Sequence, residues 1–382
     1  MYAGVPPLGR SKNNPAPHLR AHTPNQEDKW HLLVEHLWDV ADLAAKFAAK
    51  FGAAEAGRLL GLTHDLAKAS PAFQRRLERL HQKLQADSAP HAYEGAAAMA
   101  GILDILAVCV QGHHSQMRDA LISEDRLEEE NEEAERAAME LAELMDIQPI
   151  EWPTWAVDAE LTSEMFVRMC FSCLIDADRL DSEAFDEPDA PRGGYPKIAS
   201  YADFLHAHIG RFPTDDRPVT QVRQEVQEAC AKSAKSKRGF FRLTVPTGGG
   251  KTLASLRFAL DHAVKHKLDR VVVTIPFTSI IEQTAGIYTG IFGEANVLAH
   301  HSAEPVETDE KEDGFDVRRK NAAENWDIPL VVTTNVRLFD SLFGNKPGQC
   351  RRLHNLARSV IVLDEPQSFP PIFWSRTRKA RE

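Results

Sequence analysis

The sequence predicts a multidomain protein in which an all-α domain is followed by an α/β domain with a mainly parallel sheet. Two observations predict this. The chain has 382 residues, which is enough for about two or three domains of ordinary size. Its apolar residues recur with helical periodicity from about residue 30 to residue 180, and then form short β-rich runs that alternate with helical segments.

Composition identifies an ordinary globular chain. Hydrophobic residues make up 43% and charged residues 26%, which excludes wholly disordered, collagen-like and coiled-coil architectures. No stretch approaches the ~20 apolar residues of a membrane helix, and residues 1–24 lack the apolar core of a secretory signal. Five scattered cysteines are too few for a disulfide framework. We therefore expect a cytoplasmic protein.

Charge divides the chain into two unequal parts. The net charge is −11, with a net −15 in residues 1–235 and a net +4 in residues 236–382, so the two parts are expected to have different roles. Pro, Gly and Asp cluster before the change. We expect a flexible arm at 1–24, the all-α domain at 25–210, a linker and basic helix at 211–235, and the α/β domain at 236–382.

Within these domains, periodicity predicts the individual elements. Helices are expected at residues 33–47, 54–68, 95–111, 164–180, 221–231, 253–265 and 336–343, and strands at 240–245, 270–275, 330–333 and 360–363. Residues 124–143 contain 10 acidic residues and two arginines, which fits a solvated helix or a mobile insert.

A glycine-rich turn between the first expected strand and its helix predicts a phosphate-binding loop. Glycines let backbone N–H groups approach phosphate oxygens, Lys251 would reach the β- and γ-phosphates of ATP, and the Thr252 hydroxyl would ligate Mg²⁺. The strict pattern needs glycine where this chain has Val245, and the form here is that of superfamily 2 helicases. The candidate residues are Thr247, Gly248, Gly249, Gly250, Lys251 and Thr252.

Polar residues follow three further expected strands. Asp364 and Glu365 end the strand at 360–363, where Asp364 could hold Mg²⁺ through water and Glu365 could orient the attacking water. Hydroxyls and backbone N–H groups at the other two strand ends suit sugar-phosphate contacts that ignore base sequence, or are plain helix caps. The candidates for nucleic-acid contact are Pro276, Thr278, Ser279, Thr333, Thr334 and Asn335.

Histidines point to a second site. The chain has 16, of which seven fall between His31 and His114. His36 lies on the apolar face of its expected helix, and His64 and Asp65 end the next one. Neighbouring residues on a helix point about 100° apart, so a His-Asp pair can hold two metals with the carboxylate between them. Three more candidates, His91, His113 and His114, flank the helix at 95–111; unrelated core and surface histidines are the alternative.

A closing carboxylate is expected from the helix at 164–180. Asp178 shares its apolar face, whereas Asp176 shares a polar one, so Asp178 is the better candidate. Imidazole and carboxylate ligands without thiolate favour Mn, Fe, Co or Ni over a structural Zn²⁺ site. Two such metals could activate water for phosphodiester displacement.

Taken together, these segments resemble the CRISPR-associated helicase-nucleases of type I interference systems, in which an HD nuclease domain precedes a superfamily 2 helicase. The resemblance covers nearly the whole chain from about residue 27. It rests on HLLVEHLWDVA, THDLAK, HAYEGA, GHHS, CLIDADRLDSE, TVPTGGGKT, TIPFTSIIEQTA, TTNVRLFDSLF and VLDEPQ.

The resemblance implies roles for the candidate residues. One metal would be bound by His36, His64, Asp65 and Asp178, and the second by Asp65, His91, His113 and His114. The catalytic residues would be His64, Asp65, Lys68 and Glu365, with Lys68 near the scissile phosphate. The family degrades single-stranded DNA delivered by an RNA-guided surveillance complex (Cascade), with ATP-driven translocation.

The family pattern also includes a second RecA-like domain that carries an arginine finger, whereas this sequence stops 15 residues after Gln367. Loss of such an arginine costs roughly 10³- to 10⁵-fold in rate in related phosphoryl transfer. We therefore expect a truncated or split relative with weak ATP binding and no unwinding, unless a separate chain supplies the missing domain.

Two other functions stay open on the sequence alone. The chain could be an HD phosphohydrolase of nucleotides with a regulatory P-loop, or a non-catalytic assembly module. The helicase-type segments after residues 274 and 333 favour the nuclease, because a small-molecule phosphohydrolase has no use for them.

Overall fold

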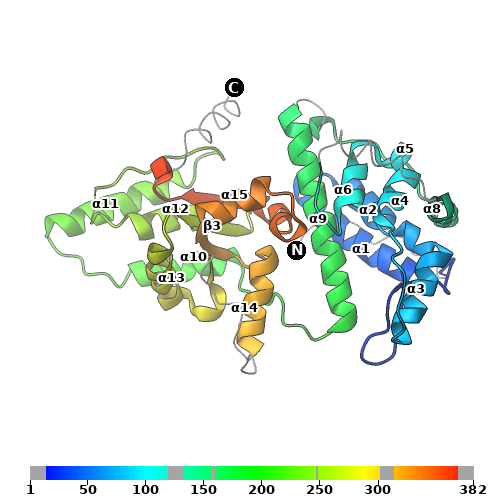
Figure 1. Ribbon diagram of the computed structural model, residues 1–382. Helices are drawn as coiled ribbons and strands as arrows, with labels where there is room; N and C mark the ends of the chain where they lie inside the picture. The colour runs from blue at the N-terminus through cyan, green and yellow to red at the C-terminus, as the bar shows by residue number, and fades with distance from the viewer. Residues whose placement is uncertain (1–13, 119–131, 157–159, 247, 302–313, 369–382) are drawn as a thin grey trace. The chain divides into compact units, whose positions relative to one another are not determined.

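The computed structural model describes residues 14–118, 132–156, 160–246, 248–301 and 314–368. The chain divides into two compact units, coloured mainly blue to green and green to red in Figure 1. The first comprises Met1–Ala190 with Ser341–Ala357, and the second comprises Pro191–Asp340 with Arg358–Glu382.

The first unit is helical. Its helices are α1 (Leu33–Ala48), α2 (Ala54–Thr63), α3 (Pro71–His81), α4 (Ala92–Ala98), α5 (Ala100–Leu103), α6 (Ala107–Gly112), α8 (Glu132–Leu144), α9 (Glu160–Asp186) and α16 (Pro347–Cys350). Helices α1, α2 and α9 pack side by side (Figure 1). A two-stranded antiparallel sheet, β1 (Arg20–His22) with β2 (His31–Leu32), precedes them.

Small residues allow α1 and α2 to approach closely. A Cβ on Gly61 would lie 2.3 Å from the Ala41 Cα, and one on Gly57 would lie 2.4 Å from the Ala44 carbonyl oxygen. Any residue larger than glycine at either position would push the two helices apart. This contact fixes the separation of His36 on α1 from His64, which directly follows α2.

The 27-residue helix α9 runs through the same core. Its Cys170 and Cys173 are fully buried, and burial raises the pKa of the Cys170 thiol well above its usual value. On another face, Asp176 pairs with Arg351 at 2.5 Å and with His354 at 3.3 Å, which fastens residues 341–357 to the first unit.

The second unit is built on a parallel four-stranded sheet in the order β4-β5-β3-β6. The strands are β3 (Arg270–Ile275), β4 (Leu298–His300), β5 (Leu330–Thr334) and β6 (Ser359–Leu363). The helices are α10 (Ile198–Ile209), α11 (Pro218–Ser233), α12 (Lys251–Lys265), α13 (Thr278–Phe292), α14 (Gly314–Asn325) and α15 (Asn335–Phe343). The core joins the sheet to α10, α12 and α13.

These two units confirm the predicted fold class, a helical region followed by an α/β domain with a parallel sheet. Two details differ. The apolar helix expected at 95–111 is broken into α4, α5 and α6, with Asp104 at a φ of 48°. The acidic segment at 124–143 is described only from residue 132, where α8 packs Ala134, Ala138 and Leu141 into the core.

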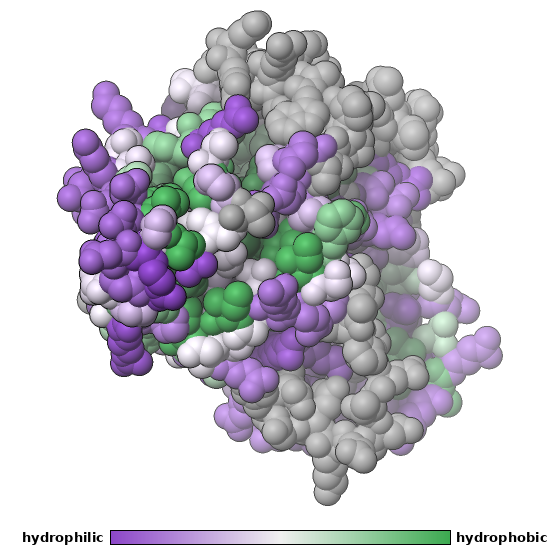
Figure 2. Space-filling view, turned by 90° about the vertical axis from the view of Figure 1, so that its left-hand side faces the viewer, coloured by the Kyte–Doolittle hydropathy of each residue, from purple (hydrophilic) through white to green (hydrophobic). Residues whose placement is uncertain are grey.

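The strand expected at 240–245 is absent from the sheet. That segment lies in the open, with Phe240 79% exposed, and the edge strand β6 is also partly exposed. Apolar (green) patches appear among polar residues on the face in Figure 2. β-propensity alone therefore does not decide whether a segment pairs into a sheet.

Among the described helices, no single one is long and apolar enough to cross a bilayer. The pair Ala92–Ala98 and Ala100–Gly112, bent by 69°, is long and apolar enough only when its two helices are taken together.

Candidate metal centre and phosphate-binding loop

Two histidines from neighbouring helices face each other inside the first unit. The Nε2 atoms of His36 and His64 are 3.2 Å apart, and both side chains are fully buried. The other ring nitrogen of each is already engaged, because His36 Nδ1 donates to Asp181 at 2.7 Å and His64 Nδ1 donates to the Gly61 carbonyl at 2.9 Å. In the neutral rings the two facing atoms are therefore both lone-pair acceptors.

Facing lone pairs repel unless a proton or a cation lies between them, so this arrangement fits a metal ion. Two carboxylates complete the group: Asp65 lies 3.3 Å from both Nε2 atoms, and Asp178 lies 3.6 Å from that of His36 and 3.7 Å from that of His64. The four ligand atoms lie within 4.8 Å of one another. We call His36, His64, Asp65 and Asp178 the first cluster.

A second cluster shares Asp65 and adds three histidines. The Asp65 Oδ1 atom lies 3.2 Å from Nε2 of His91, 3.2 Å from Nε2 of His113 and 3.9 Å from Nε2 of His114. His91 and His114 again face each other through Nε2, at 2.9 Å. Their ligand atoms also lie within 4.8 Å of one another. Asp65 is thus the single residue common to both clusters.

Lys68 is the cation nearest to Asp65, with its ammonium 2.6 Å from Oδ2. The Lys68 residue is only 3% exposed, which a lysine tolerates when its charge is paired. The short helix Leu66–Ala69 begins directly after Asp65 and places Lys68 one turn along, on the same side. Lysine and aspartate therefore form one local unit.

The charges of the two clusters set their protonation. Burial disfavours the charged forms, but Asp65 and Asp178 outweigh it and raise the pKa of His64 to about 10. Burial likewise opposes ionisation of Asp65, yet Lys68 and His64 hold the pKa of Asp65 well below its usual range. Burial lowers the pKa of His91 and brings that of His114 to about 3. The carboxylates of the first cluster favour positively charged groups beside them, and in the second cluster His91 and His114 are held in the neutral form.

The residues present fit divalent cations. Each cluster supplies imidazole nitrogens and at least one carboxylate, and no cysteine belongs to either group. Such donor sets suit Mn²⁺, Fe²⁺, Co²⁺ or Ni²⁺. Of the two acids considered on α9, Asp178 lies in the first cluster, whereas Asp176 is engaged by Arg351.

Sequence reasoning missed three residues beside the first cluster. Asp181 accepts from His36 and lies 3.3 Å from Nε2 of His31, and the His22 ring stacks on that of His31 at 5.5 Å. The signal was present for Asp181, which lies three residues after Asp178 and so on the same helical face. The two histidines are placed by pairing of β1 with β2, which no periodicity indicated.

The phosphate-binding loop lies in the second unit, ahead of α12. Gly248 and Gly250 have φ values of 82° and 81°, which favour glycine, and a Cβ on Gly249 would lie 2.5 Å from Val245. Arg223 of α11 donates to the Gly248 carbonyl at 3.0 Å. Lys251 and Thr252 open the helix. Thr247, the remaining candidate of this loop, lies outside the described residues.

The acidic pair after β6 meets the lysine of this loop. Lys251 Nζ lies 2.8 Å from Asp364 and also pairs with Glu365. These side chains are one-third to one-half exposed. Glu365 has a φ of 47°, a strained value for a residue with a side chain, of the kind that gathers at functional sites. Partial burial opposes the charge on Lys251, but the two acids outweigh it and raise its pKa.

The six candidates for nucleic-acid contact separate into two groups. Thr278 and Ser279 are exposed at the start of α13, after the partly buried Pro276. The other three are buried at the end of β5. Thr333 donates its hydroxyl to the His300 carbonyl at 2.7 Å, and the Thr334 hydroxyl accepts from the Arg337 N–H at 3.1 Å. Thr333 is therefore a core residue, Thr334 caps α15, and Asn335 follows it.

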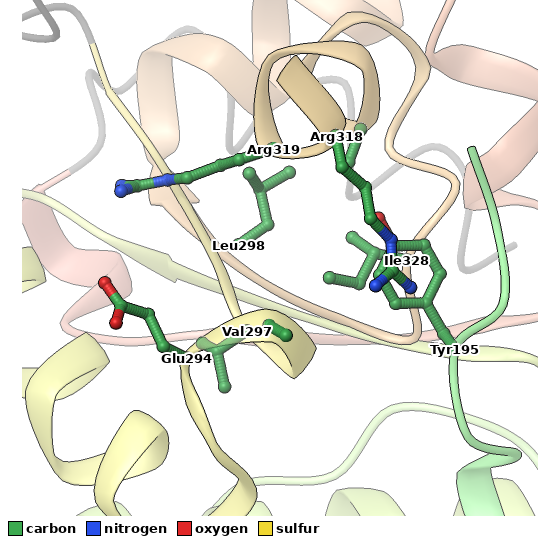
Figure 3. Close-up of a pocket in the computed structure, with 9 residues that line it drawn as sticks. Tyr195, Glu294, Val297, Leu298, Arg318, Arg319 and Ile328 are labelled. Carbon is green, nitrogen blue, oxygen red and sulfur yellow. The ribbon is translucent and has the colours of Figure 1, made fainter. Parts of the chain in front are cut away.

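A small pocket elsewhere in the second unit contains none of these candidates. It lies between α14, the segment before β4, and Tyr195 (Figure 3). Arg318 lies over the Tyr195 ring, 4.3 Å from its centroid, and donates to the Gly193 carbonyl. The Arg318 guanidinium is therefore already bound by residues of the protein.

Comparisons with known proteins give the same division of the chain. Residues 21–184 match the family model described as Cas3, HD domain, and residues 224–370 match that of the DEAD/DEAH box helicases. The chain is 32% identical over 151 residues to the CRISPR-associated nuclease/helicase Cas3 of Haloferax volcanii, covering 35% of this chain and 16% of that protein.

Solved structures share the fold. The crystal structures of T. fusca Cas3 with ADP and with AMPPNP each superpose with a TM-score of 0.56 at 17% identity, over 92% of this chain and 47% of theirs. The chain therefore spans less than half the length of these relatives.

Fold, site and family models together define the class of protein: a helical HD domain joined to a DEAD/DEAH box helicase domain. Within that class the relatives are Cas3 nuclease/helicases. The resemblance seen in the sequence is confirmed, and the chain carries a Cas3 HD domain followed by a DEAD/DEAH box helicase domain.

Proposed function

We propose that the helical unit is a metal-dependent nuclease that cuts single-stranded DNA. The observation that carries this proposal is that Asp65 is shared by two histidine clusters. A bound pair of divalent cations would supply an activated water and stabilise both oxygens of a phosphodiester displacement. A small-molecule phosphohydrolase could use the same chemistry, so the helicase unit is what favours DNA as the substrate.

The chain's own residues have separate tasks in this proposal. The first cluster and the second cluster would each hold one cation, and Asp65 would contribute to both. Lys68 keeps Asp65 ionised and contributes a positive charge beside the position of the scissile phosphate. His114, whose side chain is 46% exposed, would be the ligand nearest to entering substrate.

The second unit is proposed to bind ATP with Mg²⁺ through the glycine loop. Lys251 would exchange its acidic partners for the β- and γ-phosphates. That exchange would free Asp364 for the metal and Glu365 for the attacking water. Thr247, Gly248, Gly249, Gly250 and Thr252 would supply backbone donors and the hydroxyl ligand. Thr278 and Ser279 would contact the DNA backbone.

The cellular role proposed is CRISPR type I antiviral defence, with the RNA-guided surveillance complex (Cascade) as partner. Support for this role comes from the Cas3-type domain pair. The sequence predicts an HD nuclease domain at 25–210 and a first RecA-like domain at 236–382. We propose that the HD domain lies within the first compact unit and the RecA-like domain within the second, because α10, inside the expected 25–210, packs on the sheet of the second unit.

A nuclease assay tests the central proposal. Purified full chain is incubated with Mn²⁺ or Ni²⁺ and either a labelled single strand or nucleoside triphosphates. We expect degradation of the strand, and its loss in the variants His64→Ala and Asp65→Ala. His81→Ala is the matched control, because His81 is an exposed histidine of α3 outside both clusters.

Each alternative has its own result in this assay. Hydrolysis of nucleotides without DNA cutting would replace the nuclease by a phosphohydrolase. Absence of any turnover, with both metals bound, would leave a non-catalytic assembly module. Cutting that persists in Asp65→Ala would contradict the shared-carboxylate centre.

A further inference from the structure

We infer that Asp181 is a positioning residue of the metal centre, which makes the first cluster bind its cation more tightly than the second. Asp181 accepts from His36 Nδ1 at 2.7 Å, on the side of the ring opposite to the cluster. This inference rests on the proposed metal centre and adds a residue that does not itself touch a cation.

The geometry of His36 leaves one role for each ring nitrogen. A carboxylate can only accept, so Nδ1 of His36 carries a hydrogen, and in the neutral ring that binds a cation the lone pair is then on Nε2. Nε2 is the atom that faces Asp65, His64 and Asp178. The Asp181 carboxylate therefore selects the ring form and the orientation that a cation needs.

Among the described residues, no carboxylate is bonded to Nδ1 of three other ligands, His64, His113 and His91. His64 Nδ1 bonds to the Gly61 carbonyl and His113 Nδ1 bonds to the Val110 carbonyl, which are neutral acceptors. His91 Nδ1 is buried and has no hydrogen-bond partner among the described residues. A charged acceptor makes an imidazole a stronger donor to a metal than a neutral one does. The difference favours the cluster that contains His36.

Asp181 is itself held in place. It lies near the end of α9, one turn beyond Asp178, and is 9% exposed. Its Oδ2 atom also lies 3.3 Å from Nε2 of His31, and the His31 ring stacks on Phe185 with centroids 4.2 Å apart. One carboxylate thus ties two imidazoles to α9, and it cannot rotate away from His36 without losing both.

A third cation site in this region is the competing interpretation. Ligand atoms of His22, His31 and His36 do lie within 4.8 Å of one another. His36, however, already uses Nδ1 for Asp181 and Nε2 for the first cluster. Only His22 and His31 then remain as ligands for a third cation. Two ligands are fewer than the three or four that proteins supply to a transition metal. The contacts therefore favour a positioning role for Asp181.

Calorimetric titration of the metal-free full chain with Mn²⁺ tests the inference. For the unmodified protein we expect two binding steps of different affinity. Asp181→Ala should weaken the tighter step about 10- to 100-fold, the range found for partners of metal ligands. Asp181→Asn keeps an acceptor but loses the charge, so its loss should be smaller. The weaker step should stay unchanged in both variants.

Asp186→Asn is the matched control, because it removes an exposed carboxylate from the same helix, and both steps should be unaffected. Thermal unfolding of the metal-free variants separates structure from positioning, since a purely structural role would lower the melting temperature without changing the gap between the steps. Should Asp181→Ala fail to fold, Asp181→Asn alone decides.

Two results would overturn the inference in different ways. Unmodified protein that binds no Mn²⁺ would remove the metal centre and this inference together. Two steps in the unmodified protein that persist at the same affinities in Asp181→Asn and Asp181→Ala would remove only the role of Asp181.

Discussion

The candidate metal centre and the candidate phosphate-binding loop differ in how they are prepared for a ligand. The ligands of the first cluster are buried, and both of its ring Nδ1 atoms are engaged by the protein. The glycine loop is open, and Lys251 is neutralised by the acids that its nucleotide would displace. Burial thus preorganises one site, whereas the other must exchange internal ion pairs for its ligand.

The largest effect is expected from the residue that both clusters share. Asp65→Ala should lower metal-dependent DNA cutting at least about 10³-fold, because metal stabilisation worth several kcal/mol is lost and each ~1.4 kcal/mol is tenfold in rate. Initial rates with Mn²⁺ measure this.

The same change leaves the buried Lys68 charge without its nearest acid. A second variant, Asp65→Ala with Lys68→Met, controls for that. If this double variant recovers both folding and cutting, the lower rate of Asp65→Ala was caused by lost stability. The proposed difference between the two sites would then lose this support.

The next largest effect is expected from the buried ion pair that attaches the segment 341–357 to the core of the first unit. Arg351 and Asp176 are 3% and 1% exposed, and loss of one partner of a buried pair costs roughly 3–5 kcal/mol. Arg351→Ala should therefore lower the free energy of unfolding by about that amount in urea titration. The double change Arg351→Met with Asp176→Leu should recover most of the loss; no recovery would mean that the pair is not the cause.

A smaller effect tests the helix contact that spaces His36 from His64. Gly61→Ala places a methyl group against Ala41, and overpacking of this kind costs about 1–3 kcal/mol. The melting temperature and the affinity for Mn²⁺ should both fall. Gly101→Ala is the control, because a Cβ there meets nothing within 4 Å. Equal results for the two glycines would show that the α1–α2 spacing does not set the site.

The smallest effect on DNA cutting is expected from a change in the exposed glycine loop. Lys251→Ala should abolish nucleotide binding, measured with a fluorescent ATP analogue, and leave Mn²⁺-dependent cutting of a short single strand within about twofold. The reason is that the metal ligands and the glycine loop belong to separate compact units. A requirement for Lys251 in that assay would show that the two sites are coupled.

Prediction from the sequence went furthest where the physical signal is local. The strand β3 was expected at residues 270–275 and is observed as Arg270–Ile275, because an uninterrupted run of buried β-branched residues has one stable place in a sheet. The helices that carry His36 and Asp178 are likewise predicted by a local signal, the helical spacing of their apolar residues. The choice of Asp178 over Asp176 as a metal ligand stays a prediction. It is supported by the short distances from Asp178 to His36 and His64.

Sequence by itself determined the order of the two domains, the helical and β-rich periodicities, and the residue types able to hold cations and phosphates. Tertiary structure alone decided which of those residues meet. The segment 240–245 has strand composition but forms no strand, and Thr333 turns inward to His300. Asp181 reaches His36 across 145 positions of chain. Periodicity reports one face of one element, whereas such contacts depend on how separate elements pack.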